Sequence, residues 1–260
     1  MISFAIPYAA SGFVVGFVVG LSGVGGGSLM TPILVLLFGF HPATAVGTDL
    51  LYAAVTKSCG TVVHHIGKNV EWSLVALLAA GSMPASLVTL YVLRGLDLSS
   101  AGASAFISHV LGYALLLTAA TLVYRPYLTR VSTALALNEY PRVQRTVTIL
   151  LGAVLGVLVS LSSVGAGAIG VSVLLVLRPR LSIARIVGSD IAHAVPLTLL
   201  AGLGHLAIGT VDIALLAFLL VGSLPGIALG SVLAPRMPER HLRRLLAIVL
   251  AAVGGRLVIA

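Results

Sequence analysis

The chain has 260 residues, of which 59% are hydrophobic and only 8% are charged, and its formal net charge is +8. A soluble protein of this length could not cover its surface with so few charged side chains, so the composition predicts an integral membrane protein. The basic residues flank apolar stretches and form no run interleaved with aromatic residues, so the positive charge does not indicate nucleic-acid binding.

The first apolar stretch covers about residues 5–38 and is interrupted by the sequence GLSGVGGGSLMTP, which begins at Gly20. A glycine in a helix interior costs about 1 kcal/mol relative to alanine, and consecutive glycines cannot share one packing face. We therefore predict a helix break at Gly25–Gly27, where the restarting helix offers free N–H groups to an anion. The ligands predicted in this segment are Ser22, Gly25, Gly26, Gly27, Ser28 and Thr31.

The second stretch, about residues 43–65, carries ionisable side chains within an apolar sequence. Lys57 has no acidic residue three or four positions away, and a buried ammonium needs a partner. That partner is either an anionic substrate or an aspartate from another helix. Asp49 is predicted either to brace helices as a cap or to couple a proton, and Thr48 is a predicted substrate ligand. Tyr52 lies three residues after Asp49, on the same helix face, and is predicted to share its role in coupling or structural bracing.

Two further stretches, at about 72–93 and 104–124, complete a first half that the sequence then repeats. GFVVGFVVGLSGVGGGS from Gly12 resembles GAVLGVLVSLSSVGAGA from Gly152, and AVGTDLLYA at 45–53 matches IVGSDIAHA at 186–194. We therefore predict an all-α protein with transmembrane repeats at 1–124 and 143–260, a basic cytoplasmic linker at 125–142, and one shared transport domain. Each repeat should contain a glycine-broken helical hairpin or re-entrant segment followed by three transmembrane helices.

The positions of Lys and Arg favour an inverted orientation of the second repeat, because these residues accumulate in cytoplasmic loops. If every apolar stretch crosses the membrane once, the basic residues divide about eight to five between the two sides. If the two glycine-broken stretches return to the side they entered from, the division is about twelve to two. The second arrangement places both chain ends outside the cytoplasm.

In the second half, the predicted site residues occupy the positions that the repeat assigns to them. Predicted substrate ligands are Ser162, Ser163, Ser189 and His193. Asp190 corresponds to Asp49 and has the same two alternatives, bracing or proton coupling. No His, Cys, Asp or Glu cluster has metal-ligand spacing, no nucleophile lies beside a base, and no Gly-Lys-Ser/Thr follows the glycines. We therefore predict no metal, no cofactor and no enzymatic activity.

Three segments carry a resemblance to a known family: GFVVGLSGVGGGSLMTPIL, HPATAVGTDLLYAAVTKSCGTVVHH and GSMPASL. With their degenerate second copies, they resemble the sulfite exporter TauE/SafE family over nearly the whole chain. The resemblance implies a bacterial inner-membrane permease for sulfite, for sulfonates such as sulfoacetate, or for related sulfur oxyanions. The second copy departs from the pattern, because SSVGAGAIG lacks the triple glycine and the Thr-Pro.

These observations predict a multi-pass secondary transporter of the bacterial inner membrane, with both termini periplasmic, that binds a small anion at the glycine-rich breaks and works by alternating access. The resemblance implies that the anion is sulfite, a sulfonate or a related oxyanion, and it favours export. The expected partners are this anion, protons and the lipid bilayer, and no nucleic acid. Two alternatives are an anion channel and a non-transporting membrane scaffold or sensor.

Overall fold

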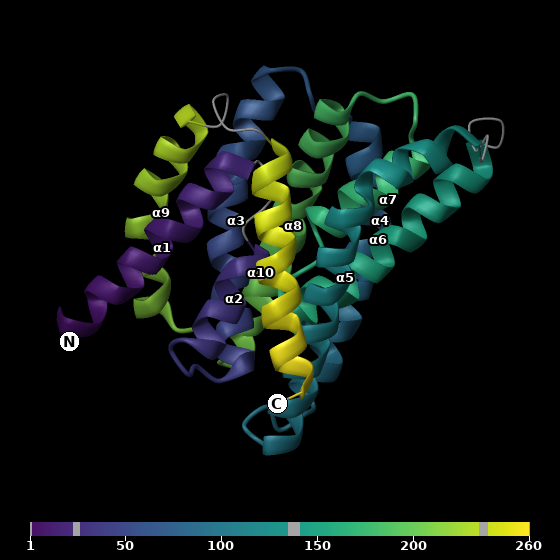
Figure 1. Ribbon diagram of the computed structural model, residues 1–260. Coiled ribbons are helices and arrows are strands. Elements are labelled where there is room, and N and C mark those ends of the chain that lie inside the picture. Colours follow the sequence, from purple (N-terminus) through teal and green to yellow (C-terminus); the bar gives the residue numbers. More distant parts are fainter. Residues whose placement is uncertain (1, 23–26, 135–140, 234–238, 260) are drawn as a thin grey trace.

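The structure is a computed structural model that describes residues 2–22, 27–134, 141–233 and 239–259, and these residues form helices without a β-strand. The first five helices are α1 (Ile2–Ser22), α2 (Gly27–Leu36), α3 (Pro42–Ile66), α4 (Trp72–Arg94) and α5 (Ala101–Ala134). The second five are α6 (Pro141–Ser162), α7 (Ala168–Leu177), α8 (Ile183–Ile208), α9 (Ile213–Leu233) and α10 (Glu239–Ile259). Their arrangement is shown in Figure 1.

The helices are those of an integral membrane protein. Within the described residues, five apolar segments are long enough to cross a bilayer: Trp72–Arg94, Ala101–Tyr124, Arg142–Ser162, Ile183–Ile208 and Ile213–Leu233. Large hydrophobic side chains such as Tyr91, Val221 and Ile248 are exposed on the outside of the bundle, where lipid would cover them. The sequence prediction of an all-α membrane protein is confirmed.

Each apolar stretch that glycines interrupt forms a long helix followed by a short one. In Figure 1, α1 rises from the N-terminus and α2 turns back toward the end of the molecule where both chain termini lie. In the second half, α6 is followed by the ten-residue α7. The connection between them uses left-handed backbone at Ser163 (φ 58°), Gly165 (φ 129°) and Gly167 (φ 125°), and this conformation ends the first helix.

The described residues of the linker expected at 125–142 are helical. Helix α5 continues past the apolar segment to Ala134, and α6 begins at Pro141. A helix can extend beyond the bilayer because its backbone hydrogen bonds are satisfied within the segment, whether lipid or water surrounds it.

Helices from the two halves of the chain pair with one another. Helix α1 packs along α9 and α6 packs along α4, while α3 crosses α8 in the middle and α5 packs against α10. Glycines make the first two pairings close. A Cβ atom at Gly12 or Gly16 would overlap the backbone of α9, and one at Gly152 or Gly156 would overlap the backbone of α4. The small-xxx-small spacing of these glycines is therefore a packing feature.

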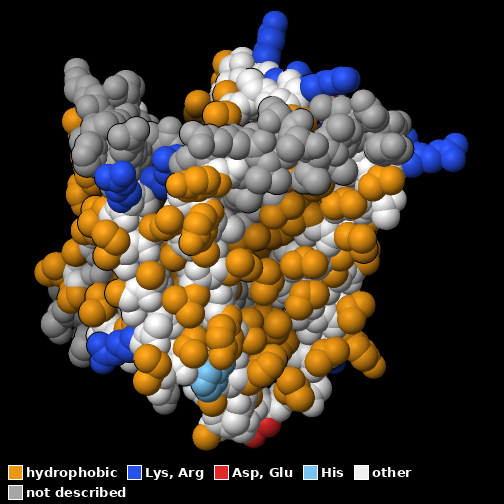
Figure 2. Space-filling view, turned by 45° about the vertical axis from the view of Figure 1, so that its right-hand side comes forward, with side chains coloured by type: hydrophobic (Ala, Val, Ile, Leu, Met, Phe, Trp, Pro, Cys, Tyr) orange, Lys and Arg blue, Asp and Glu red, His pale blue; other side chains and the backbone are white. Residues whose placement is uncertain are grey.

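The basic side chains gather toward one end of the molecule, as Figure 2 shows for one face. This end carries the α3–α4 connection with Lys68, the α7–α8 connection with Arg180, and the start of α6 with Arg142. Arg94 and Arg256 lie toward the opposite end, near the chain termini. We call the first end the basic end and the second the terminal end. Which of them faces the cytoplasm stays a prediction.

Candidate functional site

Four ionisable side chains meet where α3 crosses α8 in the middle of the protein. Asp49 and Lys57 come from α3, and Asp190 and His193 come from α8. All four are buried, and Lys57 is the most exposed of them at 5%. Because ionised groups are rarely buried without a partner or a function, this cluster is the candidate functional site.

The Asp49 carboxylate is held by the first turns of α2. Thr31 Oγ1 donates a hydrogen bond of 2.5 Å to Asp49 Oδ2. Ser163, in the left-handed connection after α6, lies close enough to interact with the same carboxylate. Asp49 Oδ1 and Ser163 Oγ have no hydrogen-bond partner among the described residues. Two of the predicted ligands, Thr31 and Ser163, therefore lie beside Asp49.

The Asp190 carboxylate faces the N-terminal end of α7. Its Oδ1 atom fills the space above the backbone of Gly170, where a Cβ atom would overlap it. The Gly167 N–H points toward the carboxylate, yet neither Asp190 oxygen forms a hydrogen bond with any described residue. The N-terminal end of a helix carries a partial positive charge, which favours a negative group at this place.

Lys57 extends toward the connection between α6 and α7. Its Nζ donates to the carbonyl oxygen of Ala166 at 3.3 Å. Asp49 and Asp190 both act on it electrostatically, yet in the described chain no carboxylate oxygen lies within the 4.0 Å of an ion pair. Among the described residues, Lys57 therefore does not form the direct salt bridge to an aspartate that the sequence left as an alternative.

A cavity of about 250 Å³ extends from Lys57 along the C-terminal half of α3, the half that leads to the basic end. Its wall follows α3 from Lys57 past Cys59 to His64, and α1 and α9 contribute Gly20 and Ser231. Lys57 is the charged group at its inner end, so a small anion entering from the basic end would meet this ammonium first.

Most positions that correspond to this cavity by the repeat offset of 140 or 141 residues are packed. Ser160, Thr198, Ala201, His205 and Leu90 are buried, whereas Leu200 and Gly204 are half-buried. His205 Nε2 hydrogen-bonds the Ser160 carbonyl at 2.9 Å, which ties α8 to α6 near the terminal end. Among the described residues, the cavity therefore lies on the side of Lys57 toward the basic end, and most of the corresponding positions toward the terminal end are packed.

His193 and Tyr52 occupy corresponding positions on α8 and α3, and both face the central cluster from the side. His193 Nε2 and Ser82 Oγ on α4 lie 2.8 Å apart, and His193 Nδ1 has no hydrogen-bond partner among the described residues. Tyr52 faces Ser223 on α9 without a hydrogen bond from its hydroxyl. The histidine thus has one ring nitrogen available for a ligand or a proton.

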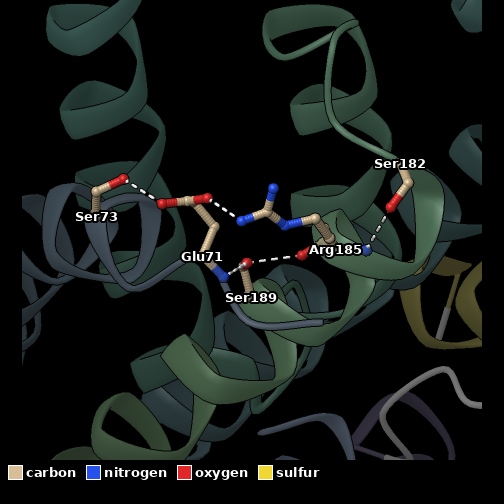
Figure 3. A network of polar contacts seen from close by, with 5 residues as sticks. All are labelled: Glu71, Ser73, Ser182, Arg185 and Ser189. Carbon is tan, nitrogen blue, oxygen red and sulfur yellow. Dashed lines mark hydrogen bonds and ion pairs between the residues drawn. The ribbon is translucent and has the colours of Figure 1, made fainter. Parts of the chain in front are cut away.

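Thr48 and Ser189 bind backbone groups at the starts of two helices. Thr48 Oγ1 accepts from Asp212 N at 3.1 Å, just before α9, and Ser189 Oγ accepts from Glu71 N at 2.8 Å, just before α4. Figure 3 shows Ser189 beneath Glu71, whose carboxylate also pairs with Arg185. In this conformation both hydroxyls are committed to bracing the fold.

Glycines make that bracing possible. A Cβ atom at Gly47 would overlap the carbonyl of Thr210, and one at Gly188 would overlap the carbonyl of Asn69. The motif Gly-Thr/Ser-Asp thus has three separate roles. Its glycine admits the loop, its hydroxyl holds the next helix, and its aspartate points into the central cluster.

The other predicted ligands are less well placed or not described. Ser162 Oγ donates to the Leu158 carbonyl at 2.7 Å, a bond within α6. Gly25 and Gly26 lie outside the described residues. Ser22 ends α1, and Gly27 and Ser28 begin α2, but the side chains of the two serines are not among those described.

The structure also adds site groups that the sequence analysis did not select. These are the Ala166 carbonyl, the α7 N-terminus at Gly167 and Gly170, and the Ser82 hydroxyl. Ser82 lies in the block AAGSMPA, which recurs as LVGSLPG, so its repetition was an available signal. The backbone groups could not be selected, because a carbonyl direction depends on the left-handed residues of the α6–α7 connection.

Comparisons with known proteins agree with this architecture. The chain matches the family model described as "Sulfite exporter TauE/SafE" over residues 8–257. It is 38% identical over 251 residues to "Probable membrane transporter protein YjnA" of Bacillus subtilis (strain 168), covering 95% of this chain and 97% of that protein. It is 25% identical over 242 residues to "Probable membrane transporter protein YdhB" of the same organism, covering 93% and 95%. No solved structure matches it. The chain therefore belongs to the sulfite exporter TauE/SafE family of membrane transporters.

Proposed function

We propose that this membrane transporter is a secondary transporter that exports small sulfur-containing anions across the bacterial inner membrane. The observation that carries the proposal is the cavity from the basic end to Lys57. It brings an entering ligand to a buried ammonium that has one backbone carbonyl partner and no ion pair among the described groups. An anion would supply the counter-charge that this ammonium needs.

Alternating access is favoured over a channel because the described residues form a cavity on one side of Lys57 and no matching cavity on the other. Most of the corresponding positions toward the terminal end are buried, and the His205–Ser160 hydrogen bond ties α8 to α6 there. A channel needs a continuous path, whereas a transporter exposes its site to one side at a time. We infer that the repeats exchange these open and closed arrangements during transport.

The choice of a sulfur oxyanion and of export rests on the family. The matching family model is described as a sulfite exporter, and an inside-negative membrane potential helps to expel an anion. Several converging donors suit such a ligand, since its oxygens accept more than one hydrogen bond. Lys57, the α7 N-terminus and the Ser163 hydroxyl can supply these donors. With the basic end in the cytoplasm, the cavity receives the anion from inside and both chain termini are periplasmic.

The test is flux through the purified protein in liposomes. We expect saturable uptake of labelled sulfite or methanesulfonate that is faster than in empty liposomes and that accelerates when unlabelled anion is present on the opposite side. Absence of flux for every sulfur anion would contradict the proposal. Flux that does not saturate and shows no exchange would instead support a channel.

A further inference from the structure

The central cluster carries more negative than positive charge before any ligand arrives. Asp49 and Asp190 contribute two carboxylates, and Lys57 contributes one ammonium. Adding an anion to the fully ionised cluster would leave it with at least two negative charges in a buried place. Burying an uncompensated charge costs several kcal/mol, so the ionised cluster is a poor anion site as it stands.

Asp190 occupies the place where an anion would find the strongest attraction. Its carboxylate lies at the first turn of α7, against Gly170, and the ammonium of Lys57 acts on it from α3. Both Asp190 oxygens lack a hydrogen-bond partner among the described residues, although the side chain is fully buried. The Asp190 carboxylate faces a helix N-terminus and a lysine, and no hydrogen bond from the described residues fixes it. It therefore resembles a bound anion more than a structural side chain.

We propose that the Asp190 carboxylate is an internal substitute for the transported anion. The two compete for the place between Lys57 and the N-terminus of α7, so the anion binds when Asp190 has taken up a proton. The proton adds to a carboxylate oxygen and gives a neutral carboxyl group, while Lys57 stays charged and pairs with the anion. One proton then moves with each anion, and the empty protein returns with Asp190 ionised and facing Lys57. A doubly charged anion such as sulfite still carries one net negative charge outward with its proton, so the inside-negative potential favours its export. This inference deepens the proposed function and rests on it.

Asp49 is the control that the repeat provides. It corresponds to Asp190 by position, but Thr31 donates to its carboxylate, and Met30 stands where the second half has Gly170. A side chain at that position and a hydrogen bond from the same helix hold Asp49 in place. We therefore assign the proton to Asp190 and a bracing role to Asp49.

The groups around Asp190 come from α3, α4, α7 and α8 itself. Helix α3 contributes Lys57 and, further away, Asp49, and α8 itself contributes His193 one turn later. Among the described residues, Lys57 is the charged side chain that acts on Asp190 directly. Helix α4 presents the Ser82 hydroxyl to His193, and α7 presents backbone only.

The first experiment measures binding of methanesulfonate and of sulfite to the purified protein at several pH values between about pH 5 and pH 8. Wild type and Asp190→Asn are compared, with Asp49→Asn as the matched control. Methanesulfonate keeps its charge over this range, and the ionisation of sulfite is common to all three proteins and cancels in the comparison. We expect wild type to lose affinity about tenfold per pH unit on the alkaline side of the transition, as one linked proton requires.

Asp190→Asn should bind with the affinity that wild type has at low pH and change less than about twofold across the range, whereas Asp49→Asn should keep the wild-type slope. Equal slopes for wild type and Asp190→Asn would overturn the proposal. A slope that disappears in Asp49→Asn instead would assign the proton to Asp49 and also overturn it.

The second experiment needs no variant. Wild-type liposomes with an internal pH indicator should show one proton moving with each anion in the same direction. Anion flux without proton movement would overturn this inference and leave the proposed function standing. Absence of any anion flux would contradict the proposed function itself.

Discussion

The Lys57 ammonium is buried and contacts a backbone carbonyl. This contact alone is too weak to stabilise a buried positive charge. The 3.3 Å contact to Ala166 satisfies one of three N–H donors. The residue at the corresponding position of the second half is Thr198, whose hydroxyl donates back to Ala194 within α8. The charge therefore distinguishes one repeat from the other, as a ligand-binding residue can and a packing residue need not.

Replacing Lys57 should weaken anion binding more than it weakens the fold. A hydrogen bond to a charged group contributes about 1.5–3 kcal/mol, so Lys57→Ala should reduce affinity by roughly 10- to 150-fold. Lys57→Arg should keep part of it. Lys68→Ala, on the exposed α3–α4 connection, is the control for charge alone. Binding of methanesulfonate by calorimetry measures the effect, and unchanged affinity in both Lys57 variants would make this residue structural.

Thr48 and Ser189 allow a separate test of ligand and bracing roles. Their hydroxyls accept part-buried backbone N–H groups, and leaving a buried donor unsatisfied costs about 1–3 kcal/mol, which is the upper range here. We expect Thr48→Val and Ser189→Ala to lower the midpoint of thermal unfolding while the affinity for methanesulfonate stays within about twofold. A loss of affinity with unchanged thermal stability would instead support direct binding to the anion.

At the scale of helices, the pairing follows from glycines rather than from hydrophobicity. A Cβ atom at Gly81 would overlap the carbonyl of Ile149 on α6, and one at Gly222 would overlap the carbonyl of Ala9 on α1. Lipid is as apolar as a leucine side chain, so helices in a membrane associate through close backbone contact. Such contact is available only where at least one of the two helices has a glycine at the point of contact.

Alanine substitutions should separate these contact glycines from unconstrained ones. Gly81→Ala forces α4 away from α6, and overpacking of this kind costs about 1–3 kcal/mol. Gly255→Ala on α10 has open space around it, so it should be neutral or stabilise by up to about 1 kcal/mol through helix propensity. Thermal unfolding in detergent measures both. Equal destabilisation by the two changes would show that backbone contact is not what holds α4 to α6.

The sequence predicts where the helices lie along the chain better than it predicts which helices pack against each other. The apolar stretches and the glycine-rich interruptions locate α1, α2, α6 and α7 closely, because helix length and glycine cost are local properties. It does not predict that α1 packs on α9 from the other half, since both partners are uniformly apolar and many pairings look equivalent. The same limit explains Thr48, whose ligand and bracing roles differ only in which distant backbone group comes near it.

For the whole molecule, the internal repeat predicts two similar halves, whereas one set of repeat positions lines a cavity and most of the corresponding set is packed. His64 lines the cavity, while His205, the corresponding residue, is buried against Ser160. The sequence is the same in every conformation of the protein, so it cannot indicate which set of repeat positions lines the cavity. The proposed alternating access requires this asymmetry, because a path open on both sides of the membrane at once would be a leak.

Cys59 offers a test of this asymmetry without engineering, because it is the single cysteine of the chain and lines the cavity. A membrane-impermeant maleimide should label it in inside-out vesicles, where the basic end is exposed, and react slowly in right-side-out vesicles. Methanesulfonate bound near Lys57 should slow the labelling. Lys68→Cys combined with Cys59→Ser is the control, because a thiol on the exposed α3–α4 connection should react at the same rate with and without the anion. Labelling of Cys59 that is faster from the periplasmic side would reverse the assigned orientation. Equal labelling from both sides, without protection, would contradict a cavity that opens to one side at a time.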